Sequence, residues 1–210
     1  MKILHAGATG LVGRHVLSLL LSDSRVTQVV APTRRALPLP HPRLHNPVVD
    51  FDNLPEDADW WAVDAVVCTL GTTIKLAGSE AAFRKVDHDY PLAVARLAHR
   101  HGARAFALNS AMGADAGSRI FYNRVKGELE TSLSGVGFDS LTFVRPGLIG
   151  GEREEFRLGE RIADAILRTL GPIVPRRYRI NPAERIAASL VDAAIDARPG
   201  THVVASDRLT

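Results

Sequence analysis

The chain has 210 residues, of which 46% are hydrophobic and 23% charged, and its formal net charge is +3. This length and hydrophobic content suit one globular domain, so we treat residues 1–210 as a single domain. The sequence has no apolar run of the ~20 residues that a membrane span needs, and no basic run interleaved with aromatic residues that predicts a nucleic-acid surface. The one cysteine, Cys68, excludes an internal disulfide. Because Cys68 suits a reducing compartment and Met1 leads directly into the first predicted strand, we expect no signal or transit peptide and a cytoplasmic location.

A glycine-rich turn follows the first apolar segment. Residues 2–6 predict a strand, residues 14–21 predict an amphipathic helix, and the turn between them reads GATGLVG. Gly7 permits the sharp turn, Gly10 lets the backbone approach a pyrophosphate, and Gly13 lets the helix pack close to the strand. The N–H groups at the positive end of the helix then face the phosphates, although a glycine-rich turn in an unrelated α/β domain stays an alternative. The candidate dinucleotide-binding residues are Gly7, Thr9, Gly10, Leu11, Val12 and Gly13.

The end of the second predicted strand, residues 26–31, is where a dinucleotide-binding fold meets the adenine ribose. NAD-selective sites usually carry Asp or Glu there, whereas this chain has Arg34 and Arg35. A guanidinium can bind two oxygens of a phosphate at once, so the two arginines favour a 2′-phosphate and hence NADP(H) over NAD(H). The alternative, that one or both arginines are solvated loop residues, stays open.

Two further strands bring candidate cofactor contacts to the same edge of the sheet. Residues 46–51 predict the third strand, and Asp50 and Phe51 at its end are candidates for the border of the adenine ring. Residues 63–70 are almost continuously apolar, as expected of a strand in the middle of a parallel sheet. Ligands of doubly wound sheets bind beyond the carboxyl ends of the strands. The candidates after this strand are Thr69, Gly71 and Thr72.

Helical periodicity continues over residues 79–101, where Pro91 is expected to kink or divide the helix. Residues 104–109 then predict a fifth strand. A sixth strand and its exit loop are predicted over residues 141–151. The remaining predicted elements are a helix over residues 158–170, a helix over residues 182–197 and a short strand over residues 202–205, with residues 152–180 as a candidate substrate lid or cap.

The residues suited to chemistry follow the fifth strand. Ser110 comes directly after it, and residues 119–133 predict a helix that carries Tyr122 and Lys126 four residues apart, on one face. An unperturbed tyrosine has a pKa of about 10, too high for acid–base catalysis at neutral pH, but a nearby ammonium favours the phenolate. In this interpretation Ser110 orients a substrate oxygen, Tyr122 is the general acid/base, and a nicotinamide supplies or takes the hydride. The alternative for Tyr122 and Lys126 is a surface tyrosine beside a surface lysine.

These motifs together resemble the short-chain dehydrogenase/reductase superfamily, and the G-x-x-G-x-x-G form of the turn is similar to its extended and atypical branches. The motifs that carry the resemblance are the turn from Gly7 to Gly13, Ser110, and Tyr122 with Lys126. The segments CTLGTT, VDHDY and GAD look more narrowly like the atypical group of NAD(P)-binding oxidoreductases named after the HIV Tat-interactive protein. The resemblance implies a Rossmann fold, NADP(H) binding and a Ser-Tyr-Lys site. It also places the turn of Arg145, Pro146 and Gly147 close to the nicotinamide.

The predicted fold is therefore α/β, a Rossmann-like doubly wound and mainly parallel sheet with a small C-terminal cap. The leading functional hypothesis is an NADP(H)-dependent oxidoreductase that acts on a small carbonyl or alcohol. One alternative is an NADP(H)-binding regulatory or redox-sensing protein without turnover. Another is an epimerase or dehydratase, for which residues 152–210 make a short substrate domain. We expect a small-molecule substrate, no metal, no nucleic-acid or membrane partner, and a monomer or homodimer.

Overall fold

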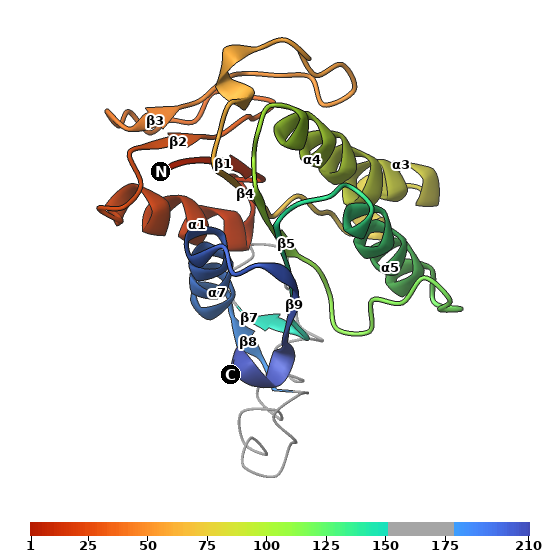
Figure 1. Ribbon diagram of the computed structural model, residues 1–210. Coiled ribbons are helices and arrows are strands. Elements are labelled where there is room, and N and C mark those ends of the chain that lie inside the picture. Colours follow the sequence, from red (N-terminus) through yellow and green to blue (C-terminus); the bar gives the residue numbers. More distant parts are fainter. Residues whose placement is uncertain (151–178) are drawn as a thin grey trace.

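A seven-stranded parallel sheet runs through the middle of the molecule, with helices on both faces (Figure 1). The computed structural model describes residues 1–150 and 179–210. The strand order is β3-β2-β1-β4-β5-β6-β9, and each neighbouring pair of these strands is parallel. The strands are β1 (Lys2–Ala6), β2 (Gln28–Val30), β3 (Leu44–His45), β4 (Ala65–Cys68), β5 (Ala105–Asn109), β6 (Ser140–Arg145) and β9 (Gly200–Ala205). The prediction of a Rossmann-like α/β fold is confirmed.

Helices cover the two faces in pairs. One pair, α1 and α7, packs together against one face, and the other pair, α4 and α5, lies on the opposite face (Figure 1). The described residues hold no helix long and apolar enough to cross a bilayer. The four helices are α1 (Leu11–Ser22), α4 (Tyr90–Arg100), α5 (Phe121–Ser134) and α7 (Ala183–Asp196).

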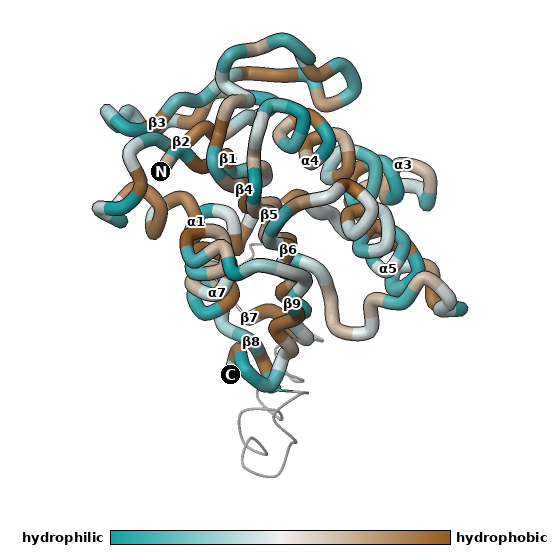
Figure 2. Tube along the Cα trace, viewed as in Figure 1, coloured by the Kyte–Doolittle hydropathy of each residue, from teal (hydrophilic) through white to brown (hydrophobic). Residues whose placement is uncertain are grey.

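The strands build two hydrophobic cores, because alternate residues of a strand point to opposite faces. In β5, Ala105 and Ala107 face the α1–α7 side, whereas Phe106 and Leu108 face the α4–α5 side. The small alanine side chains leave room for α7, which lies across β4, β5 and β6. Figure 2 shows the most hydrophobic stretches running through these central strands. Burial on both sides explains why the strands read as continuous apolar runs.

The turn between β1 and α1 is as tight as the glycine spacing predicts. Gly7 has a φ of +101°, and a Cβ built there would lie 2.6 Å from the carbonyl carbon of Thr69. A Cβ on Gly13 would lie 2.0 Å from the carbonyl oxygen of Gly7. Gly10 differs, because the nearest atom to its Cβ would be 3.5 Å away, an ordinary contact distance. Folding thus requires glycine at two of the three positions, whereas the fold itself would accommodate a Cβ at Gly10.

The helix predicted over residues 79–101 is divided into three parts. A short helix, α3 (Glu80–Arg84), leads into a π-helical turn, η2 (Lys85–Asp89), and α4 follows it. Pro91 is the second residue of α4, and it has no N–H to donate to the preceding turn. The π-helical turn accommodates this break and buries the side chain of Asp87.

The third strand lies earlier in the chain than predicted. β3 pairs with β2, and residues 46–51 contribute only an isolated bridge at Val48. Pro47 has no N–H for a strand ladder, which limits pairing there. Asp50 lies in a turn, where both its carboxylate and its carbonyl accept hydrogen bonds from the residues that follow it. The prediction of a strand over residues 46–51 is therefore wrong.

A buried asparagine ties the C-terminal part of the chain to the sheet. Two short strands, β7 (Ile149–Gly150) and β8 (Asn181–Pro182), pair with each other in parallel. The Asn181 side chain accepts hydrogen bonds from the Gly147 N–H (2.7 Å) and the Ser206 hydroxyl (2.8 Å), and donates to the Ser206 carbonyl (2.9 Å). Ser206 begins a 3-10 helix, η4 (Ser206–Arg208). The helix predicted over residues 158–170 and most of the lid predicted over 152–180 lie outside the described residues.

Candidate active site

Two adjoining cavities lie beyond the carboxyl ends of β1 and β4, where neighbouring crossovers leave in opposite directions. Their volumes are about 460 and 550 Å³, and we call them the Tyr122 cavity and the Arg34 cavity after one residue that lines each. They form one groove along the glycine turn, because both are lined by the same five residues. The shared residues are Gly10, Thr69, Leu70, Gly71 and Thr72.

The three predicted catalytic residues all line the Tyr122 cavity. Tyr122 is 36% exposed, whereas Ser110 and Lys126 are only 4% and 3% exposed. Tyr122 therefore lies at the open part of the cavity, and the serine and lysine lie deeper. Ser110 comes from the end of β5, while Tyr122 and Lys126 lie one turn apart on α5.

Lys126 is held by a buried carboxylate that sequence reasoning did not select. Its ammonium lies 2.7 Å from one carboxylate oxygen of Asp87, and the other oxygen accepts the Thr72 N–H at 2.7 Å. Burial alone would lower the pKa of Lys126, but the charges of Asp87 and Tyr122 outweigh it, and the pKa is raised. Lys126 is therefore cationic at neutral pH. Helical periodicity gave no sign of Asp87, because the π-helical turn that directs it inward breaks that periodicity.

A second carboxylate holds Ser110. The Ser110 hydroxyl donates to Glu130, which also accepts two hydrogen bonds from the Arg145 guanidinium. The hydrogen bonds that Arg145 donates to Glu130 raise the pKa of Arg145, so this pair is ionic. Because a carboxylate only accepts, Ser110 directs its proton toward Glu130 and keeps its lone pairs for the cavity. Sequence reasoning missed Glu130, although it continues the spacing of four from Tyr122 and Lys126 along one face of α5.

The Arg34 cavity has an aromatic wall beside a cationic side chain. Phe51 and Tyr90 both line it, with ring centroids 5.5 Å apart, and Arg34 lines it as well. The Tyr90 hydroxyl donates to Asp52 at 2.8 Å, which fixes the ring. This surface is suited to a flat base and a phosphate. Tyr90 falls within the helix predicted over residues 79–101 and was not among the predicted cofactor contacts.

Most of the predicted cofactor residues line the groove, and six do not. Arg145 and Gly147 are engaged with Glu130 and Asn181, as described above, and the Pro146 carbonyl accepts the Met112 N–H at 2.7 Å. Their contact with a cofactor stays a prediction. The residues that line the groove are Gly7, Thr9, Gly10, Leu11, Val12, Arg34, Phe51, Thr69, Gly71 and Thr72. Those outside its lining are Gly13, Arg35, Asp50, Arg145, Pro146 and Gly147.

An unpaired polar atom lies in the groove. The Asn109 side chain lines the Tyr122 cavity, and its Oδ1 is buried without a hydrogen-bond partner among the described residues. A buried acceptor left unpaired costs about 1–3 kcal/mol, which a donor on a bound molecule would offset. With Gly10 lining both cavities and the aromatic wall beside Arg34, these features fit an extended dinucleotide. Among the described residues, no cluster of His, Cys, Asp or Glu is placed to hold a metal ion.

Sequence comparison identifies relatives over most of the chain. Residues 7–161 match a family model described as NAD(P)H-binding. The chain is 34% identical over 177 residues to "Protein fmp52, mitochondrial" of Emericella nidulans, covering 80% of this chain and 75% of that protein. It is 38% identical over 161 residues to "Protein HTATIP2" of Rattus norvegicus, covering 75% of this chain and 66% of that protein.

Solved structures share the fold at low identity. MoeE5 in complex with UDP-glucose and NAD superposes with a TM-score of 0.73 at 17% identity, over 97% of this chain and 75% of that chain. A putative NAD-dependent epimerase/dehydratase from Bacillus halodurans gives 0.63 at 20% identity, over 96% and 92% of the two chains. At such identities the likeness shows the fold alone.

The names of the relatives correct the expected location. Several fungal relatives are named mitochondrial, including one of Aspergillus niger that is 31% identical over 97% of this chain and 91% of its own length. This finding contradicts the expected cytoplasmic location. The prediction was wrong because a single cysteine excludes an internal disulfide without specifying a compartment.

The glycine turn, the parallel sheet and the matches to known proteins all indicate a dinucleotide-binding fold. Residues 7–161 fit the NAD(P)H-binding model, and the chain shares 38% identity with HTATIP2. The chain therefore has an oxidoreductase-like nicotinamide-binding fold. It belongs to the NAD(P)H-binding family, among the atypical short-chain dehydrogenases/reductases related to HTATIP2.

Proposed function

We propose that the chain is an NADP(H)-dependent oxidoreductase that acts on a small carbonyl or alcohol. The observation that carries the proposal is that Ser110, Tyr122 and Lys126 line one cavity that is continuous with the glycine turn. A nicotinamide bound in the groove would supply or take the hydride. The chain's own residues orient the substrate and transfer a proton.

In this proposal Tyr122 exchanges the proton with the substrate oxygen. The buried Lys126 cation stabilises the phenolate over the phenol and so lowers the barrier to proton transfer at neutral pH. Asp87 holds that cation in place at 2.7 Å, so the charge beneath Tyr122 does not depend on solvent. Ser110, deeper in the cavity, would orient a carbonyl oxygen of the substrate once its hydroxyl turns from Glu130 to the cavity.

The proposed preference for NADP(H) rests mainly on Arg34. Arg34 lines the cavity beside the Phe51 and Tyr90 rings, where an adenosine would place its 2′-phosphate. Arg35 is exposed and does not line that cavity, so it is the weaker candidate of the two. A planar guanidinium can bind two phosphate oxygens at once, whereas a ribose hydroxyl offers it a single oxygen.

The test of the proposed reaction is a pair of tyrosine variants. Tyr122→Phe and Tyr90→Phe each remove one hydroxyl from the groove, and Tyr90 lies in the other cavity. Turnover of small aldehydes and ketones with NADPH, and of alcohols with NADP⁺, is followed by nicotinamide absorbance. We expect Tyr122→Phe to lower kcat by about 100-fold or more, with NADPH affinity unchanged within about twofold. Tyr90→Phe should keep its kcat, and unchanged turnover in Tyr122→Phe would refute the assignment.

A second candidate function is an NADP(H)-binding regulatory or redox-sensing protein without turnover. The observation in its favour is that Ser110 directs its proton to Glu130 and offers the cavity no donor in this arrangement. This alternative requires that wild-type protein bind NADPH tightly and oxidise it with none of the carbonyl compounds. Measured turnover that depends on Tyr122 would decide against it.

A further inference from the structure

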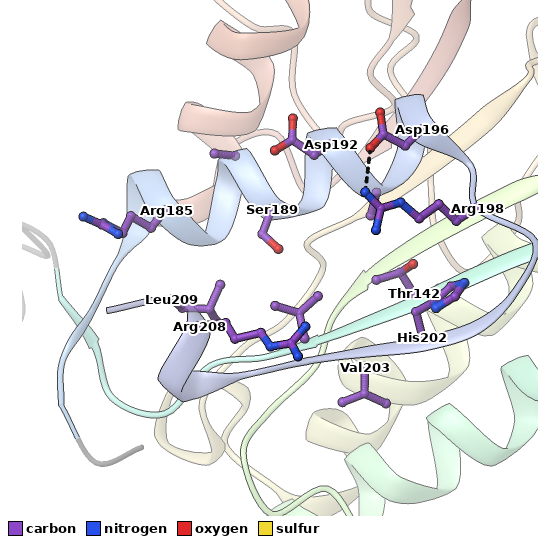
Figure 3. A pocket seen from close by; sticks show the side chains of 13 residues that line it. Thr142, Arg185, Ser189, Asp192, Asp196, Arg198, His202, Val203, Arg208 and Leu209 are labelled. Carbon is purple, nitrogen blue, oxygen red and sulfur yellow. Dashed lines mark ion pairs between the residues drawn. The ribbon is translucent and has the colours of Figure 1, made fainter. Parts of the chain in front are cut away.

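A third cavity lies apart from the nucleotide groove, between α7, β9 and η4 (Figure 3). Its volume is about 490 Å³, and none of its lining residues lines the Tyr122 or the Arg34 cavity. It lies at the edge of the sheet, on the face covered by α1 and α7. We call it the Arg208 cavity.

Hydrogen-bond donors are directed into this cavity. Figure 3 shows the Ser189 hydroxyl and the Arg208 guanidinium pointing into it, while the side chains of Arg185 and Asp192 point away. Neither Ser189 nor Arg208 makes a side-chain hydrogen bond or ion pair with another described residue. The cavity therefore presents two donors that the surrounding chain does not use.

A buried hydroxyl on the sheet adds a third donor. Thr142 lies on β6, opposite His202 of β9, and is only 5% exposed. Its side chain lines the cavity and has no hydrogen-bond partner among the described residues. A hydroxyl that lines a cavity and has no protein partner can donate to a bound molecule. Thr142 is thus available as a donor to a ligand in this cavity.

The charges that face the cavity favour an anion. Among the described residues, Arg198 is paired only with Asp196, at 3.6 Å, a distance that leaves its guanidinium able to bind a second partner. His202 shares a hydrogen bond with the Pro199 carbonyl at 3.0 Å. Since a carbonyl only accepts, that imidazole nitrogen carries a proton. With Asp192 turned away, Arg208 is the one unpaired charge that points into the cavity among its described lining residues.

We propose that the Arg208 cavity binds a small organic anion through a phosphate or carboxylate group, with Arg208, Ser189 and Thr142 as its donors. A guanidinium fork matches both oxyanions. The volume is typical of small-molecule sites and exceeds what one such group fills. Apolar side chains, among them Val204 and Leu209, complete the lining and suit the carbon part of the ligand. The site does not depend on the proposed reaction.

The test measures anion binding to the full chain by calorimetry, with NADPH in excess so that the nucleotide groove is filled. The probes are glycerol phosphate and glutarate, which carry the two head groups. We expect Arg208→Ala to weaken binding of the preferred probe by about tenfold or more, and Thr142→Val by about threefold to tenfold. The matched control is Arg104→Ala, because Arg104 is an exposed arginine paired with Asp139 away from the cavity.

Each result decides the proposal. Loss of binding in Arg208→Ala, with NADPH affinity and thermal unfolding unchanged, supports the site, and the tighter probe identifies the head group. No binding of either probe to the wild-type chain overturns the proposal. Equal binding by wild type and Arg208→Ala overturns it as well, because the anion would then lie elsewhere.

Discussion

The Lys126 ammonium and the Asp87 carboxylate lie 2.7 Å apart, and both side chains are almost completely buried. Each charge would be costly to bury alone, and together they place a permanent cation beneath Tyr122. The pair joins the π-helical turn to α5 and, through the Thr72 N–H, to the loop after β4. It is therefore both a structural link and the electrostatic support of the proposed site.

Replacing Asp87 with Asn should destabilise the chain by about 3–5 kcal/mol, because it leaves the Lys126 charge buried without a partner. Urea unfolding measures this change. The matched control is Asp207→Asn, since Asp207 is exposed and should change stability by less than about 0.5 kcal/mol. A similar small effect for Asp87→Asn would contradict the buried ion pair.

The same pair predicts a pH dependence. The pKa of Lys126 is raised in the folded chain, so its contribution to stability is fully present below the unfolded-state pKa of about 10.4. That contribution is lost as the pH rises through the still higher folded-state pKa. The difference in unfolding free energy between wild type and Asp87→Asn should thus be constant near neutral pH and shrink above about pH 10. A difference that grows at alkaline pH would oppose this account.

His5 predicts a loss of stability in acid. Burial lowers the pKa of this fully buried histidine from 6.5 to about 3. Below pH 6.5 the unfolded chain therefore binds a proton at His5, whereas the folded chain does not. The free energy of unfolding should fall by up to about 1.4 kcal/mol per pH unit toward pH 3. His5→Leu should flatten that slope, whereas the exposed His45→Leu should not. Parallel pH profiles for wild type and His5→Leu would show that His5 is not the titrating group.

The two arginines after β2 should differ in cofactor selection. Arg34→Ala should weaken NADPH binding by about 10- to 100-fold and NADH binding by less than about twofold, because NADH lacks the 2′-phosphate. Arg35→Ala serves as the control, since Arg35 does not line the cavity. Fluorescence titration with both nucleotides measures these effects. Equal losses of NADPH and NADH affinity would indicate a general charge effect.

Substitutions at Gly7 and Gly10, in the first turn, should affect stability and cofactor binding separately. Gly7→Ala should cost about 1–3 kcal/mol in backbone strain alone, and its Cβ would collide with Thr69. Gly10→Ala should unfold at the wild-type temperature, because its Cβ meets no atom closer than 3.5 Å. It should nevertheless weaken NADPH binding, since Gly10 lines both cavities. Thermal unfolding and nucleotide titration distinguish the two, and wild-type stability of Gly7→Ala would contradict the geometry.

Several elements could be predicted from the sequence because local patterns specify them. Apolar runs bounded by glycine mark β1 and β4, and a spacing of four residues places Tyr122 and Lys126 on one face of α5. β3 could not be predicted, because a strand of two residues at the sheet edge carries little hydrophobic pattern. The π-helical turn was missed for a related reason, since its extra residue per turn breaks the 3.6-residue periodicity.

The sequence by itself determined the Rossmann-like fold, the glycine turn and the three residues of the proposed site, because these depend on local patterns and on the order of the elements along the chain. Only the tertiary structure decided which charges meet. Asp87 reaches Lys126, and Glu130 reaches Ser110, from segments far apart in the chain. The Arg208 cavity likewise exists only where α7, β9 and η4 come together. Burial and partner choice depend on how elements pack, and local sequence patterns do not encode that packing.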